Sequence, residues 1–200
     1  MPLQILTYTH HLTTMLFGIF LSAFFLGVKQ NKKNVCILLG GGAVSGLFFL
    51  ICNTVFGSLF TEAIYPLFVH LPLFLLLVFY YRFRWLPSII SIMTAYLCCQ
   101  FSNWAGIFAL SLSGLDWIYY LVRIIVTVAV FAFLSRYLCQ TTALLFAKSD
   151  RELYILGAMP FVYYVFDYST TKFSMLLYSG NKVVVEFLAF AMCISYVIFL

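Results

Sequence analysis

The sequence predicts an all-α membrane protein, a bundle of about seven transmembrane helices with its N-terminus outside and its C-terminus in the cytoplasm. Of the 200 residues, 64% are hydrophobic and 8% are charged, against roughly 45–50% and about 25% in ordinary globular chains. The 11 Lys and Arg and 6 Asp and Glu residues are too few to cover the surface of a soluble protein. Soluble, disordered and nucleic-acid-binding classes are therefore excluded, and we interpret the net charge of +5 as membrane topology.

Long apolar runs are the second observation behind this prediction. About 20 apolar residues cross a hydrocarbon core of roughly 30 Å as a helix. The runs here are longer and more evenly apolar than the alternating strands of about ten residues in a membrane β-barrel. We expect spans near residues 11–28, 35–59, 63–81, 86–110, 116–134, 152–173 and 183–200. They would form one transmembrane domain over residues 1–200, with a polar stretch at 135–151 between the fifth and sixth spans.

The basic residues are distributed unevenly over the connecting segments, which is the third observation. The segments after the first, third and fifth spans hold eight of them: Lys29, Lys32, Lys33, Arg82, Arg84, Arg136, Lys148 and Arg151. The segments after the second, fourth and sixth spans hold Lys172 and Lys182. Because cytoplasmic loops carry the excess of Lys and Arg, this asymmetry places the N-terminus outside and the C-terminus in the cytoplasm.

Glycine and proline mark two of the expected spans. The second span carries Gly40–Gly42 and Gly46. It lacks the GK[ST] of a phosphate loop, which favours close helix packing. In the third span, Pro66 and Pro72 flank His70, so backbone carbonyls are freed next to an ionisable side chain.

The N-terminal segment and the cysteines exclude some further classes. No basic region precedes the first apolar run, so the segment is not a secretory signal. The six cysteines lie mostly in apolar runs, where a thiol acts as a small hydrophobe. No CxxC pair or His-rich motif accompanies them, so we expect no metal site.

Polar and ionisable side chains inside the spans are the candidate site residues, because each costs roughly 2.5–3.5 kcal/mol at a helix centre when charged. On the deduced topology they fall in the outer half of the bundle, where they would line a cavity open to an extracellular ligand. The candidate ligand-binding residues are His70, Gln100, Trp104, Arg123, Asp167 and Glu186.

Structural alternatives remain open at this point. Arg123 could pair with Asp116 or Asp167 to lock the bundle, and the Gln100 amide could simply link helices. We expect most Phe and Tyr side chains to face lipid or to form interfacial belts. No catalytic residues are predicted, since the one pairing open to an intramembrane peptidase, His70 with Cys98 or Cys99, has its thiols in apolar surroundings.

Three segments carry a resemblance to a known family: Ile64–Leu73 (IYPLFVHLPL), Ala95–Trp104 (AYLCCQFSNW) and Tyr178–Phe187 (YSGNKVVVEF). Together they resemble the N-terminal membrane-sensing region of bacterial GHKL-type sensor histidine kinases. That region is broadly similar to the one in the autoinducing-peptide receptor kinases of Gram-positive bacteria. The resemblance implies a multi-pass receptor in the bacterial cytoplasmic membrane. In that family the last helix continues into a dimerisation helix with the phospho-acceptor His and then into an ATP-binding domain.

From the resemblance we expect a membrane-embedded sensing domain of a two-component system that detects a peptide or small-molecule signal. The chain reaches Leu200 inside an apolar run, which predicts that a cytoplasmic kinase part follows. Kinase activity, homodimerisation and contact with a response regulator would belong to the full-length protein, so this chain itself is expected to be no enzyme and to hold no cofactor. The alternative is a small-solute transporter or its membrane substrate-binding subunit, which would show a midplane site and internal symmetry.

Overall fold

The computed structural model describes residues 2–57, 60–61, 64–172 and 182–199, and every element in these ranges is helical. In chain order the elements are α1 (Pro2–Phe25), α2 (Lys32–Phe56), the π-helical η1 (Pro66–His70), α4 (Leu71–Leu75), the π-helical η2 (Leu76–Tyr80), α5 (Trp85–Cys98), α6 (Gln100–Ser113), α7 (Asp116–Tyr137), α8 (Cys139–Phe146), α9 (Asp150–Lys172) and α10 (Lys182–Phe199). The prediction of an all-α chain is confirmed for the described residues.

Three helical stretches of the described chain are long and apolar enough to cross a membrane: Lys32–Phe56, Trp85–Ser113 and Asp116–Tyr137. Pro66–Tyr80 and Phe190–Phe199 are apolar but shorter. Among the described residues, each of the seven predicted runs thus contains a helix, while the spanning role of the other four runs stays a prediction.

Several helices differ in extent from the spans expected from hydropathy. The first helix begins at Pro2 rather than residue 11, because proline suits the first turn of a helix and nothing after it breaks the pattern. The third run is not one α-helix but the series η1, α4 and η2, in which the Leu71 N–H bonds the Pro66 carbonyl. The expected polar stretch at 135–151 contains the end of α7 and all of α8, whose Phe146 packs edge-on against Phe25 of α1.

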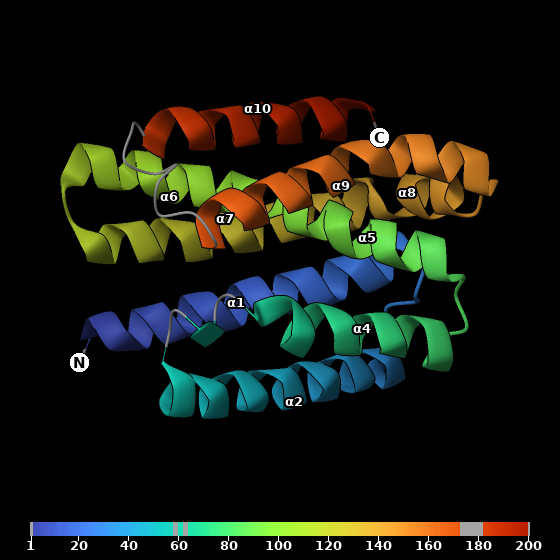
Figure 1. Cartoon of the computed structure of the whole chain (residues 1–200), viewed down its shortest axis with the longest axis horizontal. Coiled ribbons are helices and arrows are strands. Elements are labelled where there is room, and N and C mark those ends of the chain that lie inside the picture. Colours follow the sequence, from blue (N-terminus) through green and yellow to red (C-terminus); the bar gives the residue numbers. More distant parts are fainter. Residues whose placement is uncertain (1, 58–59, 62–63, 173–181, 200) are drawn as a thin grey trace.

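The helices run back and forth along one axis, so that alternate connections gather at the same end (Figure 1). The connections at residues 26–31, 81–84 and 138–149 share one end, which we call the basic end. The eight basic residues predicted to face the cytoplasm lie in or next to these connections. The Gly114 turn lies at the opposite end (Figure 1).

Helix α1 is the centre of the bundle. It packs against α2, α5, α7 and α8, and its C-terminal half is the most continuously buried part of the chain, with Leu21, Ala23 and Phe25 fully enclosed. On α5, the Ser91 hydroxyl donates to the Ser22 carbonyl of α1 at 3.1 Å. Buried hydroxyls therefore add polar links between helices that have little hydrophobic driving force in lipid.

The glycine run on α2 faces α1 over part of its length. A Cβ on Gly42 would lie 3.2 Å from Leu16 Cδ2, and one on Gly46 would lie 3.3 Å from Met15 Cε. The prediction of close packing is confirmed for these two glycines. It is not met at Gly40, which has nothing within 4 Å of that position.

The outer faces of α2 and α7 are rich in exposed apolar side chains. They include Val44, Leu47, Phe48, Val55, Phe56, Ile125, Val128 and Phe133. A monomeric protein in water rarely exposes an apolar face of this size. It fits hydrocarbon as the surrounding solvent.

Candidate functional site

Two aromatic hydroxyls bring His70 and Asp167 into one polar group, which we call the polar aromatic cluster: His70, Tyr96, Tyr164 and Asp167. His70 Nδ1 lies 2.8 Å from the Tyr164 hydroxyl. The Tyr96 hydroxyl donates to Asp167 Oδ2 at 2.5 Å. The rings of Tyr96 and Tyr164 meet edge to face with their centroids 5.0 Å apart, so the two hydrogen-bonded pairs form one contiguous, partly buried group.

Three elements position this cluster. His70 ends η1, Tyr96 lies on α5, and Tyr164 and Asp167 lie one turn apart on α9. Single π-turns inside longer helices are frequent at functional sites, and here Pro66 begins the π-turn that His70 completes. Tyr65 closes the cluster from the side, with its ring centroid 5.3 Å from that of His70.

Arg123 belongs to a second polar group on α7. Its Nη1 donates to the Tyr119 hydroxyl one turn earlier, and its guanidinium carbon lies 5.1 Å from the centre of the Tyr119 ring. The side chain lies on Gly106 of α6, where an added Cβ would come within 2.8 Å of Arg123 Cδ. Neither of the two ion pairs among the described residues involves Arg123. The ion pairs of the described residues therefore give no support to the alternative in which Arg123 pairs with Asp116 or Asp167.

Two buried polar atoms on this face of α7 have no hydrogen-bond partner among the described residues, namely Arg123 Nε and the Thr127 hydroxyl. Buried groups of this kind are usually satisfied, so each calls for an explanation such as a bound water or ligand. His10 of α1 adds a buried imidazole nearby. Its ring centroid lies 5.8 Å from that of Tyr120, and it interacts electrostatically with Arg123.

Gln100 and Trp104 have different roles in the structure. Gln100 is buried and accepts a hydrogen bond from the Asn103 side chain at 3.2 Å, which fits a structural amide. Trp104 stacks on Phe190 of α10, with centroids 4.4 Å apart and an interplanar angle of 12°. Trp104 thus joins α6 to the last helix. Glu186 lies outside the residues whose side chains are described.

The predicted site residues are therefore divided between two groups on different helices. The α5–α6 stretch separates them, because Tyr96 belongs to the polar aromatic cluster whereas Gly106 packs against Arg123. Arg123 lies seven residues after Asp116, near the connection between α6 and α7, whereas Tyr96 lies eleven residues after Trp85, in the middle part of the α5–α6 stretch.

The tyrosines are the part of the site that sequence reasoning missed. They were expected to face lipid or to form interfacial belts, yet Tyr163 and Tyr196 are among the largest fully buried side chains described. Their positions in evenly apolar runs gave no signal, because a tyrosine that bonds a partner on another helix looks the same in sequence as one at the interface.

The last helix is held against α9 at a proline. Pro160 has no N–H to donate to the carbonyl four residues earlier, and that carbonyl, on Leu156, instead accepts a hydrogen bond of 3.0 Å from the Tyr196 hydroxyl of α10. The same hydroxyl lies 3.5 Å from Thr94 of α5. Tyr196 therefore links α10 to two other helices in the buried interior.

The cysteines and other potential metal ligands do not form a further site in the described ranges. All six cysteines are free, and Cys98 and Cys193 are both buried in the core. No group of three or more His, Cys, Asp or Glu side chains comes together within the part of the chain that was described.

Fold and site together define an all-helical chain with membrane-type helices and partly buried polar groups between them. No protein-family model, curated protein or solved structure matches this chain. Its functional assignment must therefore come from its own residues.

Proposed function

We propose that this chain is the signal-sensing membrane domain of a bacterial two-component sensor histidine kinase. The polar aromatic cluster is the observation that carries the proposal. A histidine and a carboxylate within membrane-type helices cost free energy, so such residues usually have a function. Here they are hydrogen-bonded through tyrosines and partly open, so a ligand could compete for the same partners.

The proposed topology has seven spans, with the basic end in the cytoplasm and the N-terminus outside. Its support is the collection of eight basic residues at one end of the bundle (Figure 1), which agrees with the positive-inside rule. In this orientation Arg123 would lie in the outer half, within reach of an extracellular peptide or small molecule, and the polar aromatic cluster would lie deeper, near the middle of the bundle.

Helix α10 is the proposed output element. Its contacts with the rest of the bundle include the Trp104–Phe190 stack and the Tyr196 hydrogen bond to α9. Helix α9 also carries Tyr164 and Asp167. A ligand that draws these side chains away from His70 or Tyr96 would therefore change how α10 packs against α9. The ligand must bind the two helix arrangements with different affinity for this to work.

The kinase part of the proposal rests on the resemblance of the sequence motifs. A homodimer, a cytoplasmic ATP-binding domain and a response regulator would belong to the full-length protein, and this chain would supply the sensing step. The signal would act through the population of two dimer arrangements rather than through chemistry in the membrane.

The test is kinase signalling by the full-length protein with Tyr164→Phe, using Tyr154→Phe as the matched control. Tyr164→Phe removes one hydroxyl from the cluster, whereas Tyr154 is exposed on the same helix. Autophosphorylation is measured against a dilution series of concentrated culture supernatant from the source organism. Loss of one hydrogen bond worth about 1 kcal/mol should shift the half-maximal dose about fivefold. Identical dose curves for Tyr164→Phe, Arg123→Ala and the unmodified protein would refute the sensing role.

A small-solute transporter is the second candidate, because a histidine and a carboxylate linked through tyrosine hydroxyls could also relay protons. The two functions separate in sealed vesicles that contain the purified chain. A transporter would accumulate a labelled solute when a pH gradient is imposed and lose this activity in Asp167→Asn. A sensor would show no uptake with or without the substitution.

A further inference from the structure

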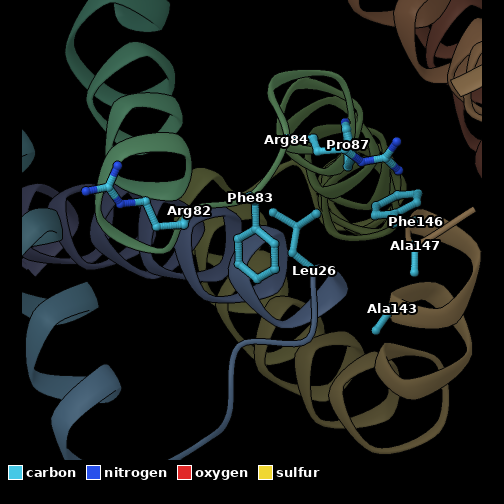
Figure 2. A pocket seen from close by; sticks show the side chains of 8 residues that line it. All are labelled: Leu26, Arg82, Phe83, Arg84, Pro87, Ala143, Phe146 and Ala147. Carbon is cyan, nitrogen blue, oxygen red and sulfur yellow. The ribbon is translucent and has the colours of Figure 1, made fainter.

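A cavity of about 300 Å³ opens at the basic end of the bundle, and Figure 2 shows the side chains that line it. Its lining comes from four places in the chain: the end of α1, the connection between η2 and α5, the first turn of α5, and helix α8 with the residue that follows it. The lining residues are Leu26, Arg82, Phe83, Arg84, Pro87, Ala143, Phe146 and Ala147. Its size is at the lower end of the range for ligand sites, roughly 300–1,000 Å³.

The floor of the cavity is apolar and its edge is cationic. Leu26 and Phe146 are buried in the core. Arg82 and Arg84 stand on opposite sides of the opening, with their guanidinium groups directed away from Leu26 and Phe83 (Figure 2). A ligand that fills this space must therefore combine a hydrocarbon part with an anionic group.

The two arginines are not equivalent. Arg84 is already neutralised, since its Nη1 lies 2.7 Å from Asp150 Oδ1 and its Nη2 donates to the Lys148 carbonyl at 2.6 Å. Arg82 is exposed and makes no hydrogen bond or ion pair within the described part of the chain. It is also the one described non-glycine residue with a positive φ, 62°. Non-glycine residues with a positive φ are uncommon and strained, and they occur in turns and cluster at functional sites.

The position of the cavity along the bundle fits a membrane interface. Exposed aromatic side chains surround the basic end, among them Trp85 beside the cavity, Tyr80 before it and Tyr137 at the end of α7. Trp and Tyr are enriched where the hydrocarbon core meets the headgroups. The cavity mouth therefore lies at the depth of lipid phosphates.

We propose that this cavity binds one anionic phospholipid, with its acyl chain on the apolar floor at Leu26 and Phe146 and its headgroup at Arg82. Basic pockets between transmembrane helices on the cytoplasmic side take anionic headgroups in this way. A free phosphate would gain nothing from the apolar floor, and a neutral lipid would gain nothing from Arg82. The site rests on membrane insertion but not on signal sensing, so it would hold for either candidate function.

The test is native mass spectrometry of the purified chain in detergent micelles, with phosphatidylglycerol or phosphatidylcholine added. One phosphatidylglycerol should be retained in preference to phosphatidylcholine. Arg82→Gln should weaken its retention about fivefold, the factor expected for one surface cation facing anionic lipid. Arg136→Gln is the matched control, because Arg136 is exposed at the same end but does not line the cavity.

A second pair of variants tests the floor without changing any charge. Ala147→Leu fills the cavity and should also reduce phosphatidylglycerol retention, whereas Ala132→Leu, exposed on α7, should not. Equal loss in Arg82→Gln and Arg136→Gln would overturn the proposal. Equal retention of the two lipids, or displacement of the lipid by millimolar inorganic phosphate, would overturn it as well.

Discussion

The hydrogen bond between Tyr196 and the carbonyl exposed by Pro160 gives the sharpest quantitative prediction. In Tyr196→Phe the ring stays and only the hydroxyl is lost, so no cavity forms. The Leu156 carbonyl then loses its donor, the Tyr196 hydroxyl at 3.0 Å. It cannot gain the usual helix donor instead, because Pro160 has no N–H. Hydrogen bonds between membrane helices average about 0.6 kcal/mol and reach about 1.7 kcal/mol. We expect a loss near the upper value, about 1.5 kcal/mol, because this acceptor is buried and has lost its ordinary partner.

Pro160→Ala provides the second arm of a double-mutant cycle. It restores an N–H four residues after Leu156, so the carbonyl no longer depends on α10. In that background Tyr196→Phe should cost about 0.5 kcal/mol or less, which gives a coupling energy of about 1 kcal/mol. The free energy of unfolding can be measured by steric trapping in bicelles.

Tyr137→Phe is the control for this cycle, because Tyr137 is an exposed tyrosine and its substitution should stay within about 0.5 kcal/mol of the unmodified protein. An equal cost of Tyr196→Phe in the unmodified protein and in the Pro160→Ala variant would refute the idea that the tyrosine compensates for the proline. A cost indistinguishable from that of Tyr137→Phe would show that the bond does not hold α10.

Three further predictions concern packing, helix ends and titration. Gly157→Ala should destabilise the chain by about 1–3 kcal/mol, since a Cβ there would lie 2.7 Å from Ile90 Cδ1 and Cγ1. Its combination with Ile90→Ala should cost less than the sum of the single changes in the same unfolding assay. Gly114→Ala should cost about 1 kcal/mol through backbone strain alone, because Gly114 has a φ of 66° and open space around it. In Ser149→Ala, the Glu152 pKa measured by NMR titration should rise, because hydrogen bonds from Ser149, with help from Lys148, hold the pKa of that carboxyl below its ordinary value. A lowered folded-state pKa stabilises the α9 terminus above the ordinary pKa, and this contribution is lost as the pH falls through the lowered one. Unchanged Glu152 titration in Ser149→Ala would contradict the capping role.

The sequence predicted helices better than it predicted their ends. Hydropathy marks where a chain is apolar, but α1 begins at Pro2 and α8 forms inside the expected polar stretch. Helix α8 packs Phe146 edge-on against Phe25 of α1. That contact is absent from any local pattern.

The candidate site was predicted in part. His70 and Asp167 were identified because ionisable side chains stand out against an apolar background. Their partners Tyr96 and Tyr164 did not stand out, since tyrosine is common throughout the apolar runs. Arg123 was identified for the same reason as His70. The hydrogen-bond partner that the structure gives it is Tyr119, one turn earlier on the same helix.

Composition alone determined that this chain consists of apolar helices, because 8% charge leaves too little polar surface for water. The distribution of basic residues determined which connections should share one side of a membrane. Only the tertiary structure decided that His70 and Asp167 lie in one cluster while Arg123 lies in another, because helix rotation and side-chain reach, not position along the span, select which residues meet. The same packing set Tyr196 against the carbonyl that Pro160 leaves without a donor, and such a match exists only once α9 and α10 lie side by side.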